Sequence, residues 1–128
     1  MGWIGVDLDG TLAEHYWPQK GPYEPTRIGD PIPAMVERVR GWLAEGREVR
    51  IFTARVGPGG SAPGFDHGDD IGPIMRAIWK WTEKHVGQRL DATCMKDYKM
   101  IELWDDRAVR VVSNTGEPCC GLLLKALY

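Results

Sequence analysis

Short apolar runs alternate along this chain with longer segments whose apolar residues recur every three or four positions. The runs stop at glycine, proline or acidic residues and predict buried strands, whereas the longer segments predict amphipathic helices. Strands that alternate with helices indicate a parallel sheet with helices on both faces. We expect an α/β, Rossmann-like, three-layer sandwich with a parallel sheet of about five strands. The predicted strands are WIGVDL (3–8), EVRIFTAR (48–55, ending at Thr53), LDATCM (90–95), MIELW (100–104) and AVRVV (108–112).

Two segments have helical periodicity and carry the punctuation that helices favour. The first, 34–45, follows Pro33 and stops before Gly46. Proline is common in a first helical turn and glycine just past a helix end. The second helix is expected to end at Gly87. Its predicted cap is Asp69 or Asp70, and its predicted buried stripe is Ile71, Ile74, Ile78 and Trp81.

Glycine and proline are concentrated in two segments, 10–33 and 56–68, which predict irregular loops. No linker interrupts the 128 residues, so a single domain over 1–128 is expected. The apolar tail GLLLKALY, residues 121–128, is expected to dock on this domain.

Composition narrows the classes of protein to consider. Hydrophobic residues make up 43% and charged residues 27%, which is typical of a globular protein. No apolar stretch approaches the roughly 20 residues of a membrane span, and no secretory signal precedes the first strand. Cys94, Cys119 and Cys120 form neither a disulfide framework nor a zinc motif, so we expect reduced thiols and a cytoplasmic location.

The formal net charge of -2 argues against nucleic-acid binding driven by bulk charge, although it leaves a local basic groove open. No membrane partner is expected. An oligomer is possible, but no feature of the sequence indicates one.

Polar residues follow four of the predicted strands. Asp7 and Asp9 follow the first strand, Thr53 ends the second, Lys96 follows the third, and the Asp105-Asp106 pair follows the fourth. In an open parallel sheet, ligands bind outside the carboxyl ends of the strands. We therefore expect these side chains to meet at one edge of the sheet.

Such a meeting point would suit a phosphoryl group. Four carboxylates in one crevice require a counter-ion, and Mg²⁺ prefers oxygen ligands while keeping waters for a phosphate. Lys96 would add positive charge, and Thr53 would add a hydroxyl donor. Gly10 would let backbone N–H groups approach an anion closely.

Each feature also has a plainer interpretation. Asp-Gly after a strand is a common turn, a threonine suits a strand end, and lysines and acidic pairs are usually solvated. Their joint order at successive strand ends favours a site.

These residues resemble the motifs of the haloacid dehalogenase superfamily of phosphohydrolases. The resemblance is carried by DLDGT (7–11), FTAR (52–55), Lys96 and WDDR (104–107), which together span most of the chain. It implies that Asp7 is a nucleophile forming an aspartyl-phosphate and that Asp9 is a general acid and then a general base. Thr53 would hold the phosphate, and Lys96 would neutralise the nucleophile and the intermediate.

The resemblance also implies a set of ligands. Mg²⁺ would be bound by Asp7, the backbone carbonyl of Asp9 and a carboxylate of the acidic pair, with Asp106 favoured as the direct ligand and Asp105 behind it. The residues expected to contact substrate are Gly10, Thr11, Ala54, Arg55 and Arg107, of which Arg55 is the favoured phosphate ligand.

Two departures from the family pattern bear on the prediction. Only residues 97–104 separate Lys96 from the acidic pair, a spacing similar to deoxyribonucleotidases, and Lys99 remains an alternative to Lys96. The sequence DDRAVRVV is similar to the phosphatase part of polynucleotide kinase-phosphatases. Residues 12–52 have no room for a large cap domain, so a capless member is implied, in which the loops 12–33 and 56–68 are left to cover the site.

The leading hypothesis is a Mg²⁺-dependent phosphomonoesterase acting on a nucleotide or a nucleic-acid terminal phosphate. Aromatic and basic residues of the first loop fit stacking on a base as well as packing of the loop on the core. The alternatives are a phosphatase of a small sugar phosphate, a metabolite phosphate or a phosphoprotein, a non-catalytic Mg²⁺-binding relative, and a receiver-like signalling domain. The aromatic and basic residues of the first loop are His15, Tyr16, Trp17, Lys20, Tyr23 and Arg27.

Overall fold

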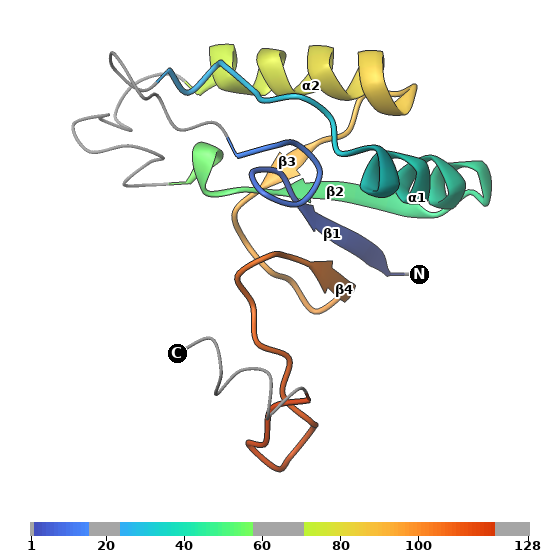
Figure 1. Cartoon of the computed structure of the whole chain (residues 1–128), viewed down its shortest axis with the longest axis vertical. Helices are drawn as coiled ribbons and strands as arrows, with labels where there is room; N and C mark the ends of the chain where they lie inside the picture. Colours follow the sequence, from blue (N-terminus) through green and yellow to red (C-terminus); the bar gives the residue numbers. More distant parts are fainter. Residues whose placement is uncertain (1, 16–23, 58–70, 120–128) are drawn as a thin grey trace.

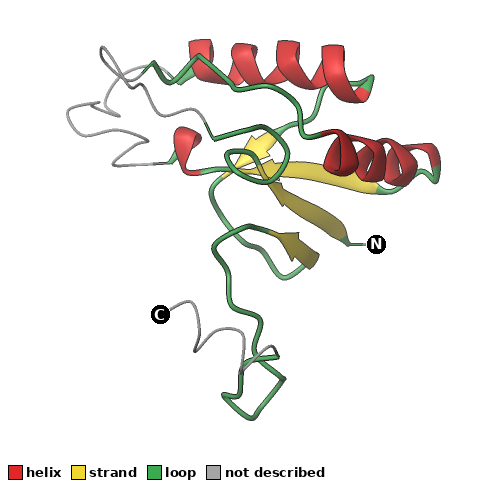
Figure 2. Ribbon diagram, viewed as in Figure 1, coloured by secondary structure: helices red, strands yellow, loops and turns green. Residues whose placement is uncertain are grey.

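The computed structural model describes residues 2–15, 24–57 and 71–119, and these form an α/β fold around one parallel sheet (Figures 1 and 2). The sheet has four strands in the order β3-β2-β1-β4, and all neighbours are parallel. The strands are β1 (Trp3–Asp7), β2 (Glu48–Phe52), β3 (Ala92–Thr93) and β4 (Met100–Trp104).

The prediction of about five strands is too high for the described residues. The segment 108–112 forms no strand, and its Val111 makes only an isolated antiparallel bridge to Pro118. After β4 the chain runs away from the sheet (Figure 1). An alternating apolar segment becomes a strand only where a partner edge meets it, and local sequence does not show the partner.

Both helices lie on one face of the sheet (Figure 2). Helix α1 (Pro33–Ala44) connects β1 to β2, and α2 (Gly72–Val86) connects β2 to β3. Because both connections step in the same direction along the sheet, right-handed crossovers place both helices on the same side. The return from β3 to β4 passes through residues 94–99, which hold no helix. The predicted three-layer sandwich is therefore not found in the described part of the chain, which has one helical layer.

The core lies between this helical layer and the sheet. Ile4, Val6 and Ile51 point from the strands and are fully buried. They pack in one cluster with Ile74 and Ile78 of α2. Burial of one such side chain contributes about 1.5–3 kcal/mol, so this stripe fixes α2 on the sheet.

The helix boundaries follow the sequence punctuation closely. Pro33 begins α1, and Gly87 ends α2 in the left-handed conformation with φ of 91°. Three residues of the predicted stripe on α2 are buried, whereas Ile71 precedes the helix and is 38% exposed. The predicted caps Asp69 and Asp70 lie outside the described residues, as do Cys120 and the tail 121–128. Neither described helix is both long enough and apolar enough to cross a membrane.

Candidate active site

The register of the sheet brings the predicted motifs to one edge. Asp7 ends β1 opposite Phe52 of β2, and Val6 lies opposite Trp104 of β4. The next residues along these two neighbouring strands are Thr53 and Asp105. The carboxyl ends of three strands therefore place an aspartate, a threonine and an acidic pair beside one another, as predicted.

Asp7 lies in an acidic cluster with Asp105 and Asp106. One carboxylate oxygen from each residue lies within 4.8 Å of the others. Burial, a hydrogen bond with Asp106 and the charges of the pair together raise the pKa of Asp7 to about 7, and burial is the largest of these causes. Like charges at this separation resist ionising together, so the cluster favours either a shared proton or a bound cation.

The turn after β1 adds two residues to this cluster. Thr11 donates its hydroxyl to Asp7 at 3.3 Å, which lowers the pKa of Asp7. Gly10 has φ of +92°, and a Cβ at this position would meet the carboxylate of Asp106. The Gly10 N–H donates to the carbonyl of Ala13 at 2.8 Å. In this conformation Gly10 therefore makes room for Asp106, while its N–H serves the turn instead of an anion.

Asp9 lies only two residues from Asp7 but in different surroundings. Its carboxylate makes a two-pronged ion pair with Arg55, from Nη2 to Oδ1 at 2.7 Å and from Nε to Oδ2 at 2.9 Å. The Arg55 side chain is 2% exposed and that of Asp9 is 22% exposed. Parallel N–H to oxygen bonds of this kind fix both the position and the orientation of a carboxylate.

Arg55 was predicted to bind the substrate phosphate, but the structure gives its guanidinium to the protein. Beyond Asp9, Nη1 donates to the carbonyl of Pro25 at 2.8 Å and to that of Arg27 at 2.7 Å. Buried at 1% exposure, Arg55 ties the loop before α1 to the site. It is a positioning residue in this conformation.

The remaining predicted residues around β2 have distinct environments. Thr53 is buried, and its hydroxyl accepts a hydrogen bond from the backbone N–H of Arg55 at 3.2 Å. This bond caps the short 3₁₀ helix η1 (Ala54–Val56), of which Ala54 is exposed. The Thr53 hydroxyl accepts this bond through its oxygen. Its O–H group can therefore still donate a hydrogen bond to a phosphate.

The acidic pair forms its own turn. The backbone N–H of Arg107 donates to the Asp105 carboxylate at 2.9 Å. Asp105 is half-buried, whereas Asp106 and Arg107 are exposed. Asp106 is thus the more accessible carboxylate of the pair, and the Arg107 side chain next to it in sequence is exposed to solvent.

The two candidate lysines both lie on the segment that returns from β3 to β4. Lys96 lies three residues beyond Thr93 of β3, and the side chain of the next residue, Asp97, accepts from the Trp3 indole N–H at 2.8 Å. Lys96 therefore lies on the return from the carboxyl edge of the sheet toward the start of β1. Lys99 precedes β4, and its carbonyl accepts from the N–H of Trp3 at the opposite end of β1. At about 3.3 Å per strand residue, this end is about 13 Å from Asp7. Neither lysine is among the groups that shift the pKa of Asp7, so the choice between Lys96 and Lys99 stays a prediction.

Sequence reasoning missed how firmly the loop before α1 is held. Besides its bonds to Arg55, its Gly29 carbonyl accepts from the indole N–H of Trp81 at 3.0 Å. Trp81 was predicted only as a core residue. No local signal marks these contacts, because they join residues 28 to 52 positions apart.

Comparisons with known proteins give little beyond the fold. No family model matches this chain, and no curated protein matches it significantly. The solved structure of a conserved protein from Bacteroides thetaiotaomicron is similar, with a TM-score of 0.53 and 21% sequence identity. The match covers 98% of this chain and 88% of that one. At this identity the similarity supports a shared α/β fold alone.

Proposed function

We propose that this chain is a Mg²⁺-dependent phosphomonoesterase of the haloacid dehalogenase type. The observation that carries the proposal is the difference between two neighbouring aspartates at the carboxyl edge of the sheet. Asp7 lies among other carboxylates, whereas Asp9 is held by a buried arginine. Two carboxyl groups with opposed surroundings are typical of sites that divide nucleophilic and proton-transfer roles.

The acidic cluster fits a hard divalent cation. Its donor set consists of oxygens from Asp7, Asp105 and Asp106. A cation would offset both causes that raise the pKa of Asp7, the burial of its carboxylate and the repulsion from the acidic pair. The more exposed Asp106 suits a direct ligand, with Asp105 behind it. The Asp9 carbonyl stays a predicted ligand. When bound, Mg²⁺ would supply positive charge that stabilises the transferring phosphoryl group.

In the first step, an Asp7 carboxylate oxygen would attack phosphorus, and the bond from phosphorus to the leaving oxygen would break. The Thr11 hydroxyl, 3.3 Å from one Asp7 oxygen, helps to fix which oxygen is presented. Thr53 and Lys96 would neutralise the phosphate oxygens, because charge stabilisation where charge develops is the largest common contribution to catalysis. The product of this step is an aspartyl-phosphate and an alcohol.

Asp9 would give the leaving oxygen a proton and then take one from the water that hydrolyses the aspartyl-phosphate. Both oxygens of Asp9 already accept bonds from Arg55, and each keeps a second lone pair for proton transfer. Arg55 fixes the direction of those lone pairs. As a carboxylate, Asp9 would act as the base. To act as the acid, it would first carry a proton on one of these remaining lone pairs.

We favour a nucleotide or a nucleic-acid terminal phosphate as the substrate. This choice rests on the similarity of DDRAVRVV to polynucleotide kinase-phosphatases and on the aromatic and basic residues of the first loop. The test is a panel of nucleotides, 3′-phosphorylated oligonucleotides, sugar phosphates, a phosphopeptide and p-nitrophenyl phosphate, each assayed with Mg²⁺ and with a chelator. We expect turnover only with Mg²⁺ and the highest kcat/KM on a nucleotide or oligonucleotide. Turnover confined to sugar phosphates or to the phosphopeptide would contradict the proposed substrate class but not the proposed mechanism.

Two lysine variants form a matched pair within this assay. We expect Lys96→Ala to reduce kcat/KM by about 100-fold or more, since the resemblance makes it the residue that neutralises the nucleophile and the intermediate. Lys99→Ala, at the other end of the sheet, should stay within about twofold of the wild type. An absence of turnover on every ester, with a phosphoprotein that persists for hours after treatment with a small phosphodonor, would contradict the proposal and favour a receiver-like domain.

A further inference from the structure

Two hollows flank one row of basic residues on the exposed side of α2. Lys80 and Lys84 line both hollows and lie one helical turn apart. Their volumes are about 390 Å³ and 470 Å³, which is within the usual range of sites for small ligands. Neither hollow contains a residue of the proposed catalytic set.

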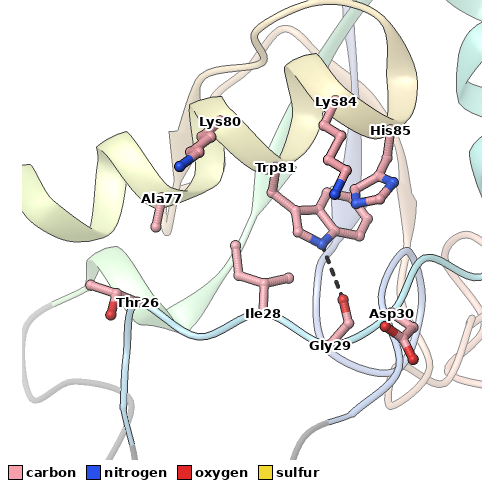
Figure 3. Close-up of a pocket in the computed structure, with 9 residues that line it drawn as sticks. All are labelled: Thr26, Ile28, Gly29, Asp30, Ala77, Lys80, Trp81, Lys84 and His85. Atoms are coloured by element: carbon pink, nitrogen blue, oxygen red, sulfur yellow. Dashed lines mark hydrogen bonds between the residues drawn. The ribbon is translucent and has the colours of Figure 1, made fainter.

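The first hollow lies between α2 and the loop before α1 (Figure 3). Lys80, Lys84 and His85 line it from the helix, and Ile28 lines it from the loop. The Trp81 indole at its base is fixed by the bond to Gly29 and by a contact with His85, whose ring centroid is 4.6 Å away. This hollow therefore combines a rigid apolar base with two ammonium groups.

Asp30 opposes this positive charge only in part. It lies near His85, and its charge raises the pKa of that imidazole, whereas burial and Lys84 lower the pKa by more. With two lysines against one aspartate, the lining stays net positive even when His85 is neutral.

The second hollow repeats the combination on the other side of the lysine row. It is lined by Trp79 together with Arg76 and Arg89, and Arg89 lies 5.5 Å from the centre of the Trp79 ring. Its one acidic residue, Glu83, pairs with Arg89 at 3.3 Å. Four basic side chains against one acid make this lining strongly positive, although the whole chain is net negative.

We propose that the α2 ridge, formed by Arg76, Lys80, Lys84 and the two hollows beside them, binds single-stranded nucleic acid. Basic residues at one-turn intervals, about 6 Å apart along the axis, suit the repeated phosphates of a strand. The half-buried Trp79 indole of the second hollow suits a base or a sugar, whereas Trp81, at 9% exposure, gives the first hollow an apolar floor. Positive charge beside an accessible aromatic ring is how sequence-tolerant single-strand sites work. A phosphopeptide would match the charge but has no repeated flat rings for both hollows.

The position of the ridge connects it to the proposed active site. Thr26 lines the first hollow, and its two neighbours, Pro25 and Arg27, are the residues whose carbonyls Arg55 holds. One loop thus forms a wall of the hollow on one side and anchors the Asp9 pair on the other. On the proposed function, from which this step follows, the ridge would hold internal phosphates of a strand whose terminal phosphate is hydrolysed.

Binding is tested apart from catalysis, by fluorescence anisotropy of a labelled 12-mer of deoxythymidine with chelator present. We expect Lys80→Glu/Lys84→Glu to weaken binding at least tenfold and to reduce the slope of log K against log salt by about 1.4, for two phosphates. Arg110→Glu, an exposed charge reversal on the segment after β4, should change binding less than twofold. The neutral Lys80→Gln/Lys84→Gln variant should fall between, and circular dichroism checks that all variants fold.

Unchanged binding in both double variants, or no binding by the wild type, overturns the proposal. Equal competition by a phosphopeptide and by the unlabelled 12-mer overturns it as well, because charge alone would then explain binding. A kinetic arm separates this proposal from the proposed function. Lys80→Glu/Lys84→Glu should lower kcat/KM at least tenfold on a 3′-phosphorylated 12-mer and less than twofold on p-nitrophenyl phosphate. Binding without any turnover would refute the enzyme alone, and turnover of small esters without binding would refute the ridge alone.

Discussion

Asp7 and Asp9 are separated by one residue, yet the protein treats their charges in opposite ways. Asp9 is neutralised within the fold by Arg55, a residue 46 positions away. Asp7 faces two further carboxylates and shares its side of the turn with a single hydroxyl donor, Thr11. A carboxylate that is paired with an arginine of the same chain needs no further cation to neutralise its charge. A carboxylate among like charges is stabilised by a proton or by a cation, and the proposed Mg²⁺ would meet this need.

Removing the charge of Asp7 or of Asp9 is expected to have the largest effects and tests whether the two aspartates have different roles. We expect Asp7→Asn to lower kcat/KM at least about 1,000-fold on every ester, because it removes the nucleophile. Asp9→Asn should depend on the leaving group, with a loss about 10- to 100-fold larger on an alkyl phosphate than on p-nitrophenyl phosphate. Glu37→Gln, at an exposed carboxylate of α1, is the control. Equal losses on both esters for Asp9→Asn would contradict a proton-transfer role.

Arg55→Met tests whether the Asp9 side is complete within the fold. Loss of the guanidinium leaves a mostly buried carboxylate and the carbonyls of Pro25 and Arg27 without their donor. Removing one member of a buried pair costs about 3–5 kcal/mol, so we expect a decrease of that size in the free energy of unfolding by urea titration. Asp9→Asn should recover part of it in the double variant.

Its control is an ion pair on the surface. Arg89→Met breaks the pair with Glu83, whose side chains are 67% and 62% exposed, and should cost less than about 0.5 kcal/mol. If Arg55→Met costs no more than Arg89→Met, the inference that Arg55 positions Asp9 and the loop is wrong.

The Asp7 side should reveal itself in the pH dependence of stability without metal. The pKa of Asp7 is raised from 3.8 to about 7 in the folded protein. Its proton therefore contributes stability that is fully present below pH about 4 and is lost as the pH rises through about 7. Full burial would make a shift of this size worth about 4 kcal/mol, and solvent screening of a partly buried group reduces the expected loss to about 1–2 kcal/mol.

Urea titrations between pH 4 and pH 8 in chelator measure this loss directly. Asp7→Asn should remove most of the dependence, and Mg²⁺ should stabilise the wild type more at pH 8 than at pH 5, because a cation competes with the proton. The same pH dependence in the wild type and in Asp7→Asn would show that Asp7 contributes none of it and that its pKa is not raised in the fold.

The same contrast explains what the sequence could reveal in advance. Asp7, Thr53 and Asp105 were predicted together because each follows a strand, and parallel strands put their carboxyl ends at one edge. Helix ends were predicted from Pro33 and Gly87, whose backbone preferences act locally. The role of Arg55 was not predictable, since a lone arginine after a strand has the same pattern whether it faces substrate or a buried partner.

The missing fifth strand has a related cause. The segment 108–112 has the residues of a strand, but pairing is decided by distant backbone, and its Val109, Val111 and Val112 stay 41–49% exposed. The basic ridge of α2 was overlooked for a different reason. Its lysines occupy the positions that the apolar stripe leaves to solvent, which is also the pattern of an ordinary surface helix.

The smallest expected effect comes from Gly10, which directly follows Asp9 in the turn after β1. Gly10 and Gly46 both have positive φ, +92° and +79°, so alanine at either position costs about 1 kcal/mol in backbone strain. Only at Gly10 does the added Cβ meet a neighbour, the carboxylate of Asp106, whereas Gly46 has nothing within 4 Å. We expect Gly10→Ala to cost about 1 kcal/mol more than Gly46→Ala by urea titration. The displaced Asp106 should also weaken Mg²⁺ binding several-fold by calorimetry in Gly10→Ala and leave it unchanged in Gly46→Ala. Equal metal affinity in the two variants would mean that Asp106 is no ligand, and that the pairing of Asp7 with Asp105 alone has to account for the site.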